Sequence, residues 1–365
     1  MNSNKYININ ETPVRTKSWV GVNDISLKDY KGLDIKEFTN SNLYFGEGAT
    51  VKKLELCKHE KLSNNLIYGV GRELTKEADN LYNKGYIVKI DKDIELEEPI
   101  VIKFDMDGYN NSLVDNLNII AEEGSKATIV INYKSWDDKE GYHNGVCRVV
   151  AKKGSDLKII KVNLLNNNTG NFDSIEGTVE EGANIDYVAI DFGGKYSVTN
   201  YHGDLVGNKG SSTINSIYLG DDKKTIDINY IMTHKGKGTK SKIVTNGALK
   251  DEAKKTFKGT IDFKRGASKS EGAESEYCML LSEKARSKAM PLLLCEEDDV
   301  SGEHAASSGN IDENKLFYLM SRGLSYKEAR KVIVQGAFNP IIDMIPVDDI
   351  REEVLAELDR RLVNG

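Results

Sequence analysis

The residues best suited to chemistry gather in one stretch, Cys295 to His304, with the sequence CEEDDVSGEH. It combines a thiol, several carboxylates and an imidazole, which are all donor types that can bind iron. Cys278 precedes this stretch by about half of the repeat described below. A cysteine on a strand is more often a small core residue, and acidic runs are usually solvated turns. From the residues alone, both interpretations stay open.

Cysteine spacing argues against a complete local metal site. The chain has four cysteines and no C-x-x-C pair: Cys57, Cys147, Cys278 and Cys295. This spacing matches neither a zinc knuckle nor a ferredoxin run. We therefore expect reduced thiols, and any metal site must be assembled from distant residues or shared between chains. The other histidines lack comparable neighbours and are interpreted as structural: His59, His143, His202 and His234.

Composition and missing motifs exclude several functions. The net charge is −7, with 50 basic and 57 acidic residues mixed along the chain, so we expect no nucleic-acid partner. No apolar stretch is long enough for a membrane span, and the N-terminus lacks the apolar region of a signal peptide. We expect a soluble, cytoplasmic protein. No P-loop or G-x-S-x-G motif occurs, so we predict no ATP site and no enzymatic activity in this chain.

A repeat must position these residues. Six segments begin with glycine and recur about every 28 residues, at Gly124, Gly154, Gly182, Gly210, Gly238 and Gly266. Strand-like apolar runs flank each glycine, and glycine permits the positive φ of a tight turn. A strand–turn–strand unit of this length cannot close its own core, so neighbouring units must stack. The repeat predicts a mainly β fold with a parallel β-solenoid over about residues 85–294; a β-sandwich is the alternative.

The regions on either side of the solenoid have a different character. We divide the chain into an irregular, partly helical N-terminal region (1–84), a β-helix core (85–310) and a helical unit (311–365). A helix is expected over 74–82. In the tail, Asp312 and Ser325 are expected N-caps, with the second helix running to Gln335 before Gly336.

The tail helices should also have apolar faces. Ala329, Val332 and Ile333 are predicted to share one face of the second tail helix. Pro346 and Asp348 open a last helix, in which Ile350, Val354, Leu355, Leu358 and Leu362 recur with helical spacing. Helices with an apolar face after the last coil suggest a partner-docking unit.

The segment from Ser301 to Phe338, SGEHAASSGNIDENKLFYLMSRGLSYKEARKVIVQGAF, resembles the C-terminal signature of the SufB/SufD family of iron–sulfur cluster assembly proteins. The stretch from Gly85 to Ile102 looks like the family's entry into its core, and Pro13 to Trp19 is a weaker echo of its N-terminal part. The resemblance, closest to SufD, implies a right-handed parallel β-helix. It also implies a SufBCD-type complex in which a SufC-type subunit is the ATPase.

The resemblance also implies candidate site residues. His304 matches the histidine that SufD-type subunits offer at the interface with SufB, where a transient iron–sulfur cluster forms. Glu303, Cys278 and Cys295 match positions with ligand-type residues in SufB, whereas Ala305 replaces a SufB glutamate. The tail helices are the expected docking site for the ATPase, through Leu316, Phe317, Arg322, Ala329, Val332 and Ile333. A SufB-type subunit is expected on the β-helix edge, with a homodimer when the chain is alone.

The sequence leaves three other functions open. Cys278 keeps open a SufB-like homodimeric scaffold. Parallel β-helices also include secreted polysaccharide lyases, but the missing secretion signal and the helical tail disfavour that class. A purely structural adaptor without ligands of its own is the third alternative.

Overall fold

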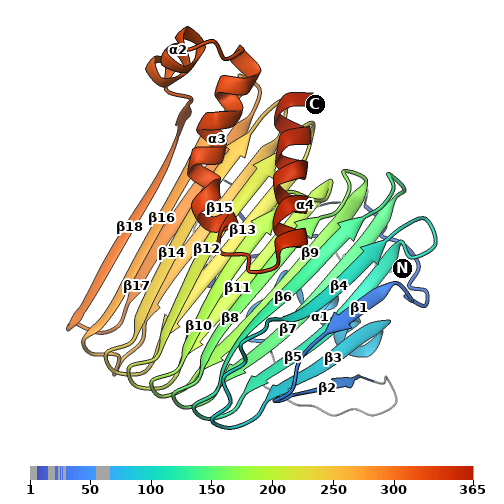
Figure 1. The fold of residues 1–365 in the computed structure, drawn as a ribbon. Helices are drawn as coiled ribbons and strands as arrows, with labels where there is room; N and C mark the ends of the chain where they lie inside the picture. The colour runs from blue at the N-terminus through green and yellow to red at the C-terminus, as the bar shows by residue number, and fades with distance from the viewer. Residues whose placement is uncertain are drawn as a thin grey trace.

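Two nine-stranded sheets face each other and form the body of the protein (Figure 1). This computed structural model describes residues 6–14, 21–23, 25, 27, 30–54 and 66–364. The first sheet has the order β1 (Ser41–Tyr44), β4 (Ile100–Met106), β6 (Lys126–Ser135), β8 (Asp156–Leu164), β10 (Asn184–Asp191), β12 (Ser211–Gly220), β14 (Lys240–Leu249), β16 (Ser270–Leu280) and β18 (Val300–Asn310). The second has the order β17 (Arg286–Cys295), β15 (Lys254–Phe263), β13 (Thr225–His234), β11 (Tyr196–Leu205), β9 (Thr169–Val179), β7 (Gly141–Ala151), β5 (Ser112–Ala121), β3 (Lys84–Ile90) and β2 (Ala49–Lys53).

From β3 onward, successive strands alternate between the two sheets, and neighbours within each sheet are parallel. The chain thus winds as a parallel β-helix of about eight coils. The predicted solenoid is confirmed, and the β-sandwich alternative is wrong because the strand pairs of the coils are parallel.

The lumen between the sheets is filled by side chains that stack from coil to coil. One row in the first sheet, which we call the central row, is formed by residues that pair directly in the ladder: Ile100, Ile129, Ile159, Tyr187, Ile214, Ile243, Glu274 and His304. Its first six members are buried in the main apolar core. The row therefore changes from apolar to ionisable side chains at its last two positions.

The repeated glycines lie in the turns that lead from the second sheet to the first. Gly124, Gly154, Gly182 and Gly238 have positive φ, and the N–H of each donates to a carbonyl in the next coil. Stacked turns of this kind give the repeat its period. Gly210 and Gly266 lie in the same turns but outside this column, whose positions are taken there by Lys209 and Lys269 with positive φ. Gly266 also has a positive φ, three residues before Lys269. The six-glycine alignment is thus correct for four positions and shifted for two.

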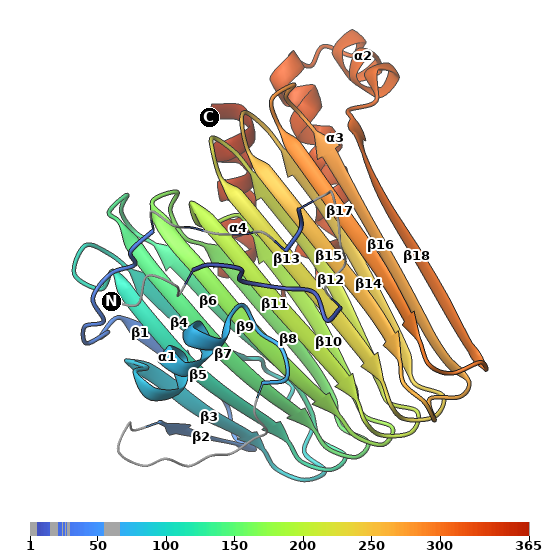
Figure 2. The same ribbon diagram turned by 180° about the vertical axis from the view of Figure 1, so that it is seen from behind.

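Helices and irregular chain cover the outer faces of both sheets. On the first sheet, α3 (Tyr326–Ile342) and α4 (Asp348–Asp359) bury a second apolar cluster, which includes Phe192 stacked on Phe338 (Figure 1). On the second sheet, α1 (Arg72–Asn80) and the N-terminal segment cover a third cluster (Figure 2). A last turn, η1 (Arg360–Asn364), is fastened by the buried Arg361, whose Nη1 lies 2.7 Å from Asp221 Oδ1. No helix in the described ranges is long and apolar enough to cross a bilayer.

The tail helices differ from their prediction in extent. Asp312 caps α2 (Glu313–Ser321), and Ser325 caps α3 with Glu328 completing a capping box, as expected. However, α3 does not end before Gly336 but continues to Ile342, because its last turns bury apolar side chains on the sheet. Packing thus outweighs the low helix propensity of glycine.

The predicted face of α3 needs one correction. Ala329 is buried and Ile333 packs against the first sheet, whereas Val332 is 42% exposed. The buried face is centred between Ile333 and Val334 and repeats at Ala337 and Phe338, which leaves Val332 on the opposite side. The predicted face was wrong only at this position.

The two ends of the β-helix are finished differently. At the first end, β1 and β2 are short and pair antiparallel with β4 and β3. At the other end, β17 and β18 are the outermost strands of their sheets among the described residues, and neither contains a buried residue. We call this pair the terminal coil.

Burial of His234 makes the stability of the fold depend on pH. His234 is fully buried, with Nδ1 2.7 Å from Thr239 Oγ1 and Nε2 2.8 Å from Ser241 Oγ. Burial lowers the pKa of His234 to about 4. The unfolded chain therefore binds a proton between about pH 6.5 and 4 that the folded chain does not.

We expect the free energy of unfolding to fall as pH drops through that window, by at most roughly 1.4 kcal/mol per pH unit from this residue. Urea titrations from pH 7.5 to 4.5 should show a shallower fall in His234→Gln. His304→Gln is the control, because that side chain is exposed. Equal slopes for the wild type and His234→Gln would contradict this assignment.

Candidate functional site

All four candidate ligands lie on the last strands, β16, β17 and β18. On β16, Glu274, Glu276 and Cys278 are buried and face the lumen. In the pairing with β18, Glu274 lies opposite His304 and Cys278 lies opposite Ser308. A Cβ added to Gly302 would lie 2.7 Å from Leu293 Cδ1, so the even-numbered residues of β18 also face inward. His304 thus forms an exposed last layer over Glu274.

The candidates do not meet at one point. Four positions of β18 separate His304 from Ser308, the partner of Cys278, which corresponds to about 13 Å. Glu303 points to the opposite face of the strand from His304. Cys295 pairs with Phe263 near the turn, and its Sγ lies 3.0 Å from the Glu297 carbonyl oxygen. Within the described residues, no three His, Cys, Asp or Glu side chains could hold a metal together.

A buried ion pair lies next to Cys278. Lys255 Nζ and Tyr218 Oη each lie 2.7 Å from Glu276 Oε1, and the side chains of Lys255 and Glu276 are fully buried. Burial raises the pKa of the Cys278 thiol, although the nearby Lys255 opposes the shift. Cys278 is therefore a protonated, inaccessible thiol in this chain alone, because its cationic neighbour does not outweigh the loss of solvent.

Glu274 was missed in the sequence. Only 3% of it is exposed, and neither carboxylate oxygen has a hydrogen-bond partner. Burial, and then the neighbouring Glu276, raise the pKa of Glu274 to about 8. The alternation in SEGAESEYC (270–278) could have revealed it, because a period of two places both glutamates on the buried face with Cys278.

The predicted docking residues fall into two groups. Phe317 and Arg322 are exposed on α2 and at its end, and Leu316 is half-buried. No residue of α2 is buried, and the helix projects beyond the terminal coil (Figure 1). By contrast, Ala329 is buried, and Ile333 packs against the apolar cluster between the tail helices and the first sheet.

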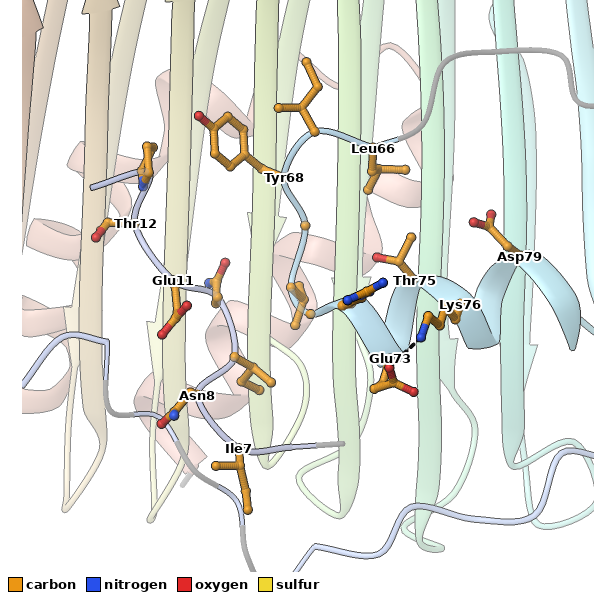
Figure 3. A pocket seen from close by; sticks show the side chains of 18 residues that line it. Ile7, Asn8, Glu11, Thr12, Leu66, Tyr68, Glu73, Thr75, Lys76 and Asp79 are labelled. Carbon is orange, nitrogen blue, oxygen red and sulfur yellow. Dashed lines mark hydrogen bonds and ion pairs between the residues drawn. The ribbon is translucent and has the colours of Figure 1, made fainter. Parts of the chain in front are cut away.

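A cavity lies away from the candidate ligands. It has a volume of about 840 Å³ and is formed by the N-terminal segment and α1 over the second sheet (Figure 3). Arg72, Glu73, Lys76 and Asp79 give it mixed charge, and Lys76 Nζ lies 2.9 Å from Glu73 Oε1. None of the candidate ligands lines it.

Comparison with known proteins agrees with the fold and the tail signature. The chain is 28% identical to the iron–sulfur cluster assembly protein SufD of Bacillus subtilis over 296 residues, which is 80% of this chain and 67% of that protein. It is 27% identical to a SufBD family protein of Staphylococcus saprophyticus over 73% of this chain. The chain covers only 58% of that relative's length.

These matches place the chain in the class of iron–sulfur cluster assembly proteins. The family model described as the SUF system FeS cluster assembly, SufBD core domain, matches residues 104–337. Since this is more than half of the chain, the protein belongs to the SufBD core family, and among the relatives above it is similar to SufD.

Burial predicts a clear order of thiol reactivity. In the folded chain, iodoacetamide should modify the exposed Cys295 at least tenfold faster than Cys278 or Cys147, since burial also raises the pKa of Cys147 to about 12. Peptide mapping by mass spectrometry resolves each site. In guanidinium chloride the three rates should converge. Fast modification of Cys278 in the folded chain would show that the terminal coil opens readily.

Proposed function

We propose that this chain is a scaffold subunit of a SufBCD-type complex in which an iron–sulfur cluster is assembled. The terminal coil carries the proposal. Its two strands have unpaired edges, and β18 presents mostly small residues around His304 (VSGEHAASSGN). An open edge of this kind can pair with a strand of another chain.

In this proposal a SufB-type subunit covers the terminal coil, or a second copy does so when SufB is absent. His304 then lies at the interface and offers an imidazole to the transient cluster. Glu303 and Cys295, both exposed, are secondary candidates, and the partner supplies the remaining ligands. Three free thiols in the described residues fit a reducing compartment such as the cytoplasm.

The burial of Cys278 favours this heteromeric scaffold over the homodimeric one. A scaffold that used Cys278 as its own ligand would need a thiolate at a fully buried position. The higher pKa of that thiol opposes ionisation, whereas His304 is already exposed. We therefore assign the essential thiolate to the SufB-type partner.

The first test uses the complex reconstituted with SufB- and SufC-type partners. His304→Ala should leave folding and partner binding intact but reduce cluster formation at least tenfold, measured by absorption under anaerobic conditions. Ser301→Ala, on the outer face of the same strand, is the matched control. Cys278→Ser should be milder, and an equally severe loss would favour the homodimeric scaffold. Full assembly by the double variant would leave only the structural adaptor.

Docking of the ATPase is assigned to α2. Phe317 is 75% exposed and Tyr318 is 57% exposed, while the apolar faces of α3 and α4 are already buried on the sheet. An exposed aromatic pair on a projecting helix is typical of an interface anchor. We further propose that a SufC-type ATPase binds there and supplies the ATP site.

Phe317→Ala should weaken binding of a SufC-type ATPase at least tenfold without changing the thermal unfolding of the chain, because Phe317 makes no core contact. Tyr109→Ala is the control, since Tyr109 is 92% exposed between β4 and β5, near the other end of the β-helix from α2. Isothermal titration calorimetry measures both. Equal affinity of Phe317→Ala and wild type would remove α2 from the docking site.

A further inference from the structure

The carboxyl group of Glu274 is buried in the lumen without a hydrogen-bond partner. Its side chain crosses the lumen to Gly259 on β15, where an added Cβ would lie 2.0 Å from Oε1. The carboxylate therefore occupies space that only a glycine leaves free. Buried as it is, it receives no hydrogen bond at either oxygen. Such a group in a native protein calls for an explanation, and a missing ligand is one.

Nearby cations are already engaged. Lys255 pairs with Glu276, and Lys258 points to the outer face, where its Nζ lies 2.6 Å from Asp227 Oδ1. In the central row the residue beneath Glu274 is Ile243, which is fully buried. The apolar row thus ends in a carboxylate that has no partner on its inner side.

The only layer beyond Glu274 in the described chain is His304. The two residues pair in the β16–β18 ladder and face the same way. A carboxylate oxygen and a neutral imidazole nitrogen are a donor pair that suits ferrous iron. Cys278 is too far along the strand to join them, as shown above.

We propose that Glu274 and His304 form an entry site for a divalent iron ion at the open end of the lumen. The inference rests on the proposed function, because it takes iron as the cargo. Glu274 binds from inside the last closed coil and releases its carboxyl proton to solvent as the metal ion binds, and His304 binds from the terminal coil. With only two donors from this chain, the remaining coordination positions stay open to water and to the partner subunit. Iron held in this way is already next to the interface.

The test uses the full chain and Co²⁺ as an air-stable substitute for ferrous iron. Wild type should bind one Co²⁺ per chain by calorimetry, with visible absorption reporting the ligands. Glu274→Gln keeps the size of the side chain, and His304→Ala changes an exposed residue, so both should fold as judged by circular dichroism. Each should weaken Co²⁺ binding at least tenfold. Glu271→Gln, on the solvent face of the same strand, should stay within twofold.

Absence of Co²⁺ binding to wild type, or unchanged affinity in either site variant, would overturn the site. If Glu274→Gln does not fold, the Co²⁺ affinity of His304→Ala alone decides whether the site exists. Cluster formation measured in the same variants separates the two proposals. If His304→Ala blocks cluster formation but Glu274→Gln binds Co²⁺ normally, the scaffold role stands and the entry site is wrong. If Co²⁺ binding falls tenfold in both variants while clusters form normally, the metal-binding site stands, but its role as an entry for cluster iron is wrong.

Discussion

Every coil of this protein depends on the coil beside it. The backbone groups of a strand are satisfied by the strands above and below, and the side chains of the central row stack on their neighbours in that row. The stacked turns follow the same rule, since the N–H of Gly154 donates to the carbonyl of Glu181 one coil later. Stacking of coils could continue indefinitely, because each added coil exposes a new edge to the next one. The ends must therefore be treated specially, and the candidate site lies at one of them.

Three of the lysines buried along the β-helix each have a buried carboxylate partner. Lys161 pairs with Asp173, Lys255 with Glu276 and Lys258 with Asp227, all at distances below 2.8 Å. Pairing of this kind is what allows charge to be buried. Glu274 breaks the pattern, one layer below the terminal coil. The buried carboxyl group without a partner therefore lies directly beneath the terminal coil.

The sequence was informative about the coils because they repeat. The period of about 28 residues predicted the parallel solenoid before any contact was known, and the caps at Asp312 and Ser325 predicted where the tail helices begin. The end of α3 could not be predicted, since the sheet surface that holds its last turns is built from strands far away in the chain. The positive φ of Lys209 and Lys269 could not be predicted from the spacing of the glycines for a similar reason, because the stacked turns impose this backbone conformation.

The site was harder to predict than the fold. Cys295 and His304 are close in sequence, yet they lie at different points along the terminal coil. Glu274 is distant in sequence from His304, yet it is the direct neighbour in the ladder. Ladder pairing links residues about one period apart, so a search for ligands within one segment overlooks those pairs. A comparison between equivalent positions of successive repeats would have found them.

The unequal ends of the β-helix also limit how many chains can join. Within the described residues, the first end finishes in the short antiparallel strands β1 and β2, whereas the other end finishes in the long parallel strands β17 and β18. Two such chains that meet through their open ends leave no free end for a third. In the proposed pairing, addition of strands therefore ends at two chains and does not continue into a fibre.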